Sequence, residues 1–173
     1  GGVHRDITPD QFDHIVHTLE GIKDEYAQIV KTFVNDSSVK NRLVGVGHIS
    51  KEDAAKLSMV GPFLRASGVD YDVRNLRNGG YAYLDDFQPV TRTEGDCYAR
   101  VLVRTQEVLQ SIDIIEEMIS KIPAGDIDVK VTGAPADGAE ACNVLEQPRG
   151  ECYYYAKGNG TKYLDRMRMR TPT

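Results

Sequence analysis

Hydrophobic residues in the N-terminal part of the chain recur every three to four positions, the spacing of an amphipathic helix. Thr8 is suited to the N-cap, Pro9 to the first helical position, and Gln11 completes a capping box. We expect this helix to end near residues 35–37. Its apolar stripe consists of Phe12, Ile15, Val16, Leu19, Ile22, Tyr26, Ile29, Val30 and Phe33.

A second helical stripe begins near residues 94–96 and stops before Pro123. It consists of Cys97, Val101, Val108, Leu109, Ile112, Ile115, Ile119 and Ile122. The pattern predicts two long helices that pack antiparallel and form the core. Between them we expect a brief helix capped by Ser50 and ended at residues 61–62, and then a long irregular connection over residues 67–93.

Beyond Pro123 the hydrophobic period changes from that of a helix to that of a strand. Ile127, Val129 and Val131 alternate with polar residues, which predicts a half-buried strand. Residues 152–157 and 162–170 flank a Gly-Asn-Gly turn, which predicts a hairpin. The expected fold is mainly α-helical α+β, with two long packed helices and a small C-terminal β-hairpin region. The length favours a single domain over residues 1–173.

The last predicted strand has two chemically different faces. One face holds Tyr163, Met167 and Met169, and the other holds Arg166, Arg168 and Arg170. The arginines are either the solvated face of an edge strand or a surface that meets an acidic neighbour. The sequence leaves both interpretations open.

Composition narrows the class of protein. The chain is 40% hydrophobic and 27% charged, as in ordinary soluble globular domains. Its net charge of −5 argues against nucleic acid as a partner. Since no apolar run approaches the roughly 18 residues of a membrane-spanning helix, we expect any membrane association to come through partner proteins.

Histidine and cysteine offer few metal ligands. His14 and His17 stand three residues apart on the first predicted helix, but without a carboxylate or thiol partner a solvated helix face is the better interpretation. The cysteines are Cys97, Cys142 and Cys152, an odd number with no C-x-x-C pair. This pattern indicates neither a disulfide framework nor a self-contained metal site, and it suits a reducing compartment. The residue pattern by itself predicts no autonomous active site.

Short blocks with distinctive composition follow one another along the chain. Residues 1–6 read Gly-Gly-Val-His-Arg-Asp, residues 41–42 read Asn-Arg and residues 50–54 read Ser-Lys-Glu-Asp-Ala. Residues 61–69 then read Gly-Pro-Phe-Leu-Arg-Ala-Ser-Gly-Val, and residues 72–74 read Asp-Val-Arg.

The series continues into the second long helix. Residues 95–100 read Gly-Asp-Cys-Tyr-Ala-Arg, followed by Arg104, Glu107, Ser111 and Ile115. In order and spacing these blocks resemble the family shared by nickel–iron hydrogenase large subunits and the forty-nine-kilodalton subunit of respiratory complex I. The resemblance implies that the chain is part of the hydrogenase large-subunit fold.

The block with chemical meaning is Gln-Pro-Arg-Gly-Glu at residues 147–151. In the hydrogenases the matching arginine lies over the metal centre and its diatomic ligands. The resemblance therefore implies that Pro148 and Arg149 bind the cofactor and that Arg149 is catalytic, stabilising a cyanide ligand and assisting H2 cleavage. It also implies that Thr173 donates its hydroxyl to another cyanide. Because arginine is a poor base in water, the role of Arg149 would depend on rigid positioning.

One residue of this block, Arg149, favours the hydrogenase branch. Complex I subunits mostly carry lysine at the position of Arg149 and keep the acidic residue that is Glu151 here. An arginine together with that glutamate resembles the membrane-bound, energy-converting hydrogenases.

The family holds nickel and iron with two C-x-x-C motifs, and neither is present in these residues. We therefore expect no metal ligand here, and we expect the chain to be an internal fragment that is inactive and free of nickel and iron. A nickel–iron centre would belong to the full-length parent.

Three hypotheses for that parent remain. The first is the catalytic large subunit of an energy-converting nickel–iron hydrogenase, which exchanges electrons with ferredoxin-type carriers and is coupled to ion translocation. The second is a complex I-type subunit involved in quinone reduction, and the third is a cofactor-free scaffold paralogue. Expected partners are a small iron–sulfur subunit and integral membrane subunits, on the cytoplasmic face of the membrane. Exposed helix faces also predict self-association of the fragment.

Overall fold

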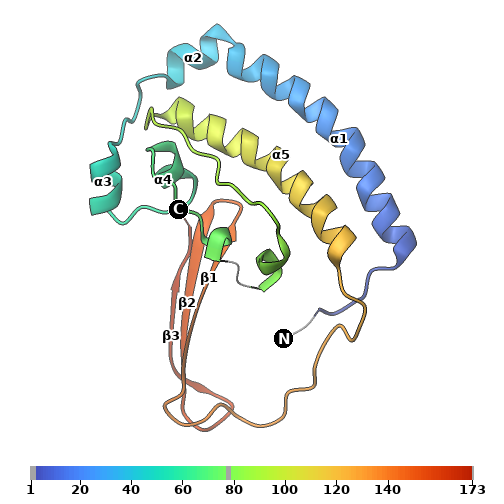
Figure 1. The fold of residues 1–173 in the computed structure, drawn as a ribbon. Coiled ribbons are helices and arrows are strands. Elements are labelled where there is room, and N and C mark those ends of the chain that lie inside the picture. The colour runs from blue at the N-terminus through green and yellow to red at the C-terminus, as the bar shows by residue number, and fades with distance from the viewer. Residues whose placement is uncertain (1–2, 77–78, 173) are drawn as a thin grey trace. The chain divides into compact units, whose positions relative to one another are not determined.

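Two long antiparallel helices, α1 (Pro9–Asn35) and α5 (Cys97–Lys121), dominate the computed structural model, which describes residues 3–76 and 79–172 (Figure 1). The Tyr98 hydroxyl near the start of α5 donates to the Val34 carbonyl near the end of α1 at 2.7 Å. Further along, Lys23 forms an ion pair with Asp113. Both predicted helices and their antiparallel packing are confirmed.

The hydrophobic core does not lie between these two helices. Helix α1 has no buried side chain, and the buried cluster consists of Ala66, Ala99 and Val103, with Val90 packed against it. Ala66 belongs to the short helix α4 (Pro62–Ala66) and the other two buried residues belong to α5. The prediction that the long helices form the core is therefore wrong, because small residues at the start of α5 let α4 approach closely.

Short helices fill the segment between α1 and α5. As predicted, Ser50 caps a brief helix, accepting a hydrogen bond from the Asp53 amide at 3.1 Å. Pro62, expected to end that helix, instead begins α4, because proline suits a first helical position. The short helices other than α4 are α2 (Ser37–Leu43), which was not predicted, α3 (Lys51–Lys56), and the 3-10 turns η1 (Val73–Leu76) and η2 (Gly79–Tyr83).

A three-stranded antiparallel sheet forms the C-terminal part of the chain, with strand order β1-β2-β3. Its strands are β1 (Glu140–Gln147), β2 (Gly150–Gly158) and β3 (Leu164–Arg170). The predicted β2–β3 hairpin is confirmed, and β1 is an additional strand. The predicted mainly helical α+β fold is thus correct.

The strand expected over residues 127–131 is wrong. Val129 is 74% exposed and Val131 is 77% exposed, and of this segment only Asp128 forms an isolated bridge. The Ile127 carbonyl accepts one hydrogen bond, from the Val3 amide at 3.1 Å. A segment with alternating residue types forms a strand only where a neighbouring strand supplies a continuous ladder of backbone hydrogen bonds.

The chain divides into two compact units, each described separately below. One comprises residues 7–124 and contains every helix named above, and the other comprises residues 1–6 and 125–173 and contains the sheet. The single-domain organisation expected from length stays a prediction. None of the helices in residues 3–76 and 79–172 combines the length and the apolar composition of a membrane-spanning segment.

Candidate functional site

Arg149, the residue with the predicted catalytic role, lies at the tip of the β1–β2 hairpin. Pro148 and Arg149 form the turn itself, and Gln147 pairs with Gly150 at its base. Both turn residues are exposed, whereas Gly150 is buried with φ of +136°, where other residues are strained. Because proline fixes its own φ and glycine closes the turn, the backbone that presents Arg149 is narrowly defined.

A buried carboxylate lies directly behind this turn. Glu151 is 6% exposed and faces Glu146 across the hairpin. Like charges directly opposite each other destabilise a sheet, and Arg170 compensates by forming an ion pair with Glu151. This pair links the end of β3 to the base of the turn that carries Arg149.

Thr173, the third predicted cofactor-binding residue, lies outside the described residues. Its neighbour Pro172 is buried. A joint site formed by Pro148, Arg149 and Thr173 stays a prediction.

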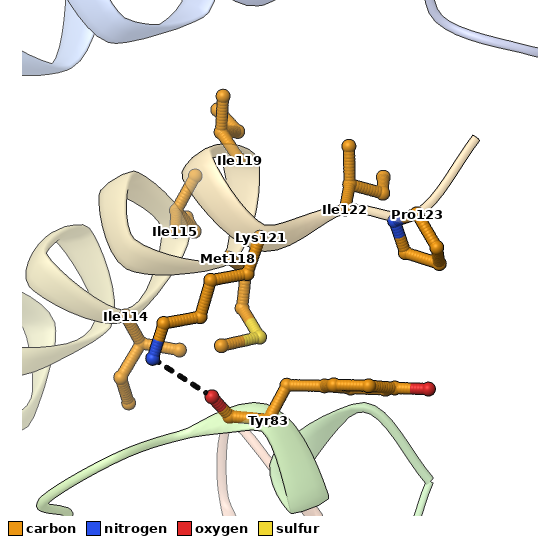
Figure 2. A pocket seen from close by; sticks show the side chains of 8 residues that line it. All are labelled: Tyr83, Ile114, Ile115, Met118, Ile119, Lys121, Ile122 and Pro123. Atoms are coloured by element: carbon orange, nitrogen blue, oxygen red, sulfur yellow. Dashed lines mark hydrogen bonds between the residues drawn. The ribbon is translucent and has the colours of Figure 1, made fainter.

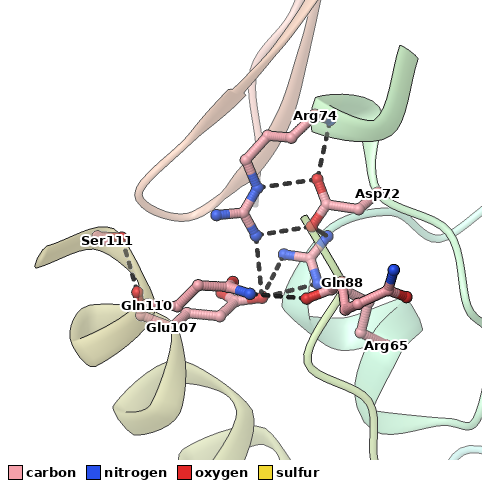
Figure 3. Close-up of polar contacts among 7 residues, drawn as sticks. All are labelled: Arg65, Asp72, Arg74, Gln88, Glu107, Gln110 and Ser111. Carbon is pink, nitrogen blue, oxygen red and sulfur yellow. Dashed lines mark hydrogen bonds and ion pairs between the residues drawn. The ribbon is translucent and has the colours of Figure 1, made fainter. Parts of the chain in front are cut away.

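A second concentration of charge is buried in the helical unit (Figure 3). Arg65 of α4 is 0% exposed, and its guanidinium lies 3.0 Å from Asp72 Oδ2 and 2.7 Å from Glu107 Oε1. Arg74 of η1 donates from Nη2 to Asp72 Oδ2 at 2.6 Å, and the same nitrogen lies 3.6 Å from Glu107 Oε1. Two guanidinium groups thus share two carboxylates, and we call these four residues the buried charge network.

The buried charge network is electrically balanced, with two positive and two negative side chains. Arg74 also lies 4.6 Å from the centre of the Phe87 ring, which covers it with apolar surface. Removing one member of such a group leaves an uncompensated buried charge, which costs about 3–5 kcal/mol. Because its carboxylates pair with guanidinium groups from different elements, the network joins α4, η1 and α5.

A second arginine-centred junction holds the start of α5. Arg100 donates to the Gly95 carbonyl at 2.9 Å and also to the Gly47 carbonyl, and its guanidinium lies 4.7 Å from the centre of the Phe63 ring. Asp96 caps α5 by accepting from the Ala99 amide at 2.8 Å. The same carboxylate accepts from the Gly45 amide at 2.7 Å, so one side chain connects the cap to a distant loop.

Gly95 is required at this junction for steric reasons. Its φ is +66°, and a Cβ there would lie 2.3 Å from the Ile49 carbonyl oxygen. The Gly95 carbonyl accepts from the Ile49 amide at 2.9 Å, and the Gly95 amide donates to the Ala66 carbonyl at 2.9 Å. Two backbone segments therefore meet at a position where only glycine fits.

Metal-ligating side chains do not gather in the described part of the chain. Within it no group of three or more histidine, cysteine, aspartate or glutamate residues could hold a metal ion. Cys142 is exposed, Cys152 is buried, and the Cys142 sulfur lies 3.1 Å from the Tyr153 hydroxyl. That hydrogen bond is the main reason that the pKa of Tyr153 is raised. The described residues thus do not supply the thiolate set of a nickel–iron centre.

An apolar pocket of about 350 Å³ lies where the C-terminal end of α5 meets η2 (Figure 2). Its polar group is the ammonium of Lys121, which donates to the Tyr83 carbonyl at 3.0 Å and pairs with Glu117 at 2.5 Å and Asp85 at 2.7 Å. The hydrogen bonds to Asp85 and Glu117 raise the pKa of Lys121, and the bond from Lys121 is the first cause that lowers the pKa of Glu117. The remaining lining is Ile114, Ile115, Met118, Ile119, Ile122 and Pro123.

The fold and these motifs define a class of redox-complex subunits. Residues 1–137 match the family described as "Respiratory-chain NADH dehydrogenase, 49 Kd subunit". The chain belongs to this family, which also includes hydrogenase large subunits, as the motif resemblance implied.

Relatives from different redox complexes match the chain at similar identity. An NADH-quinone oxidoreductase subunit of Phocaeicola vulgatus is 35% identical and aligns with 98% of this chain and 33% of its own length. The "Carbon monoxide-induced hydrogenase" of Rhodospirillum rubrum is 34% identical over 100% of this chain and 48% of its own length. Family members are thus oxidoreductases, and this chain spans about half of their length or less.

A solved structure shares the fold over nearly the whole chain. A chain of the "membrane-bound sulfane sulfur reductase (MBS), an archaeal respiratory membrane complex" has a TM-score of 0.89 and 32% identity. The match covers 99% of this chain and 48% of that one. Relatives of this protein therefore include a subunit of a respiratory membrane complex.

The residues of the buried charge network are visible in the sequence, but their spacing does not indicate that they meet. Arg65, Asp72, Arg74 and Glu107 all fall within the family blocks. The sequence feature that could have revealed the network is the recurrence of charged side chains at defined spacing within these blocks. Such residues are either exposed functional groups or buried partners, and contact information is needed to distinguish the two.

Proposed function

We propose that the full-length protein is the catalytic large subunit of an energy-converting nickel–iron hydrogenase, which interconverts H2 with protons and electrons. The observation that carries this proposal is Arg149, an exposed arginine on a turn whose backbone is restricted by Pro148 and Gly150. The motif around it matches the hydrogenase pattern, and a hydrogenase is among the relatives that cover the whole chain.

In this proposal Arg149 contributes a fixed positive charge and hydrogen-bond donors. Guanidinium stays protonated at every physiological pH and carries five N–H donors in a planar fork. It can therefore hold an anionic or diatomic metal ligand through its charge and its N–H donors. Because the described residues do not supply the metal's own ligands, these thiolates must come from elsewhere in the assembled protein.

The proposed assembly follows from the kind of complex in which relatives occur. Its partners would be a small iron–sulfur subunit that passes electrons to ferredoxin-type carriers, and integral membrane subunits that translocate ions. The protein would then lie on the cytoplasmic side of the membrane. Support comes from the structural relative, a chain of a respiratory membrane complex.

The second candidate is a complex I-type subunit involved in quinone reduction, without nickel. The family description and the relative from Phocaeicola vulgatus favour it. Since the hydrogenase and quinone-oxidoreductase relatives differ by one percentage point in identity, overall similarity does not separate the two candidates. Our preference for the hydrogenase rests on the arginine at position 149.

The test uses the full-length protein in its complex. We expect stoichiometric nickel, and we expect Arg149→Lys to lower the kcat for H2 evolution by about 100-fold, the usual effect of removing one preorganised charge-stabilising donor. Nickel content should stay unchanged, and Arg5→Lys, at an exposed position of the same unit, should leave the rate unaltered. Quinone reduction without nickel would establish the second candidate instead. A complex that shows neither H2 evolution nor quinone reduction would support the scaffold paralogue.

A further inference from the structure

Among the described residues, strand β3 is an edge strand of the sheet. It pairs with β2 on one side, and the described residues provide no strand on the other side. All seven of its residues are exposed. Every second residue of such a strand directs its backbone N–H and C=O groups away from the sheet, so β3 offers a row of hydrogen-bonding groups to another strand.

The two faces of β3 differ sharply in chemistry. Met167 is 52% exposed and Met169 is 60% exposed on one face. Arg166 and Arg168 lie on the other face, and in the described part of the chain neither forms an ion pair, whereas Arg170 is occupied by Glu151. A neighbour that satisfied this edge would need negative charge on one side and apolar groups on the other.

Protection of the edge explains only half of this pattern. Charged side chains on an edge strand discourage unwanted pairing, which accounts for the arginines. It does not account for the two exposed methionines on the opposite face. Methionine and arginine are both enriched in protein–protein interfaces, so the two faces together favour a partner protein. Pairing with a second copy is also unfavourable, because it would bring arginines opposite arginines.

We propose that β3 accepts a strand from a partner polypeptide in which acidic residues alternate with apolar residues. The acidic side chains would face Arg166 and Arg168, and the apolar side chains would cover Met167 and Met169. Backbone hydrogen bonds to the open edge would provide affinity, and the alternation would provide the register. This inference does not depend on which redox reaction the complex performs.

Two measurements on the assembled complex test the proposal. A photo-crosslinker introduced as Met167→p-benzoylphenylalanine should join β3 to a partner segment with the acidic and apolar alternation. Hydrogen exchange should show the outward-facing amides of β3 protected in the complex. A cross-link to the protein's own chain or to a second copy would overturn the proposal, as would unprotected amides.

Charge reversal provides a third, quantitative test. Arg166→Glu together with Arg168→Glu should weaken binding of the cross-linked partner by about tenfold or more, because like charges across an interface are strongly unfavourable. The control Arg5→Glu with Lys130→Glu changes charge equally at exposed positions of the same unit and should leave binding unaltered. Equal effects of the two double variants would show that only net charge matters and would contradict the proposed strand pairing.

Discussion

Arginine has opposite roles in the two units of this protein. In the helical unit, Arg65 and Arg74 are buried and fully engaged with Asp72 and Glu107. In the sheet unit, Arg149 is exposed on a turn, and Arg166 and Arg168 are exposed on an edge strand. Buried guanidinium groups fix the positions of helices, whereas exposed ones on defined backbone remain available to ligands or partners. Burial therefore separates the arginines that join helices from those that stay accessible.

The largest expected effect is on the free energy of unfolding, when a buried arginine and an exposed arginine are replaced in turn. Arg65→Met removes one charge from the buried charge network and should lower the free energy of unfolding by about 3–5 kcal/mol. Arg168→Met removes the same charge from an exposed strand and should change it by less than about 0.5 kcal/mol. Urea unfolding of both variants measures the difference. Similar losses would mean that burial does not set the role of these arginines.

A smaller loss of stability is expected when either of two aspartates that cap helices is replaced. Asp96 is buried and also holds the Gly45 amide, whereas Asp36 is exposed and accepts from the Val39 amide at 3.0 Å. Asp96→Ala should cost about 2 kcal/mol and Asp36→Ala about 0.5–1 kcal/mol, the upper and lower parts of the range for N-caps. Thermal unfolding distinguishes them, and the reverse order would contradict the structural role given to the Asp96–Gly45 bond.

The smallest effect concerns the ion pair between Glu117 and Lys121 beside the apolar pocket. Since Lys121 lowers the folded-state pKa of Glu117 from its ordinary 4.5, the stabilisation is present above that ordinary value. It is lost as pH falls through the lowered pKa. Glu117→Gln should therefore lower Tm slightly at neutral pH and converge with the unchanged protein in acid. A deficit that persists at low pH would show that the charge of Glu117 is not its cause.

Much of the fold was predictable because local signals agreed. Helix α1 has a capping box and a continuous stripe, with the Gln11 carboxamide accepting from the Thr8 amide at 3.0 Å. Strand β1 was missed because its exposed first half shows little hydrophobic alternation, and its pairing with β2 determines it. The segment at residues 127–131 shows the converse, an alternating pattern without a partner ladder.

The candidate site was predictable only in part. Pro148 and Arg149 were identified because they belong to a motif of adjacent residues. The turn that they form was not predicted, because strand β1 was missed. The ion pair between Glu151 and Arg170 depends on the register of two strands, and the buried charge network depends on packing of α4 against α5. Neither long-range arrangement is encoded in local spacing.

The close contact at Gly95 limits which substitutions this protein and its relatives can tolerate. A side chain there would occupy the space of the Ile49 carbonyl, so almost any coding change at that position should be eliminated by selection. Relatives that have drifted to about a third identity with this chain should still carry glycine at the corresponding site. That position should therefore serve as a fixed reference for aligning distant members, whichever reaction they catalyse.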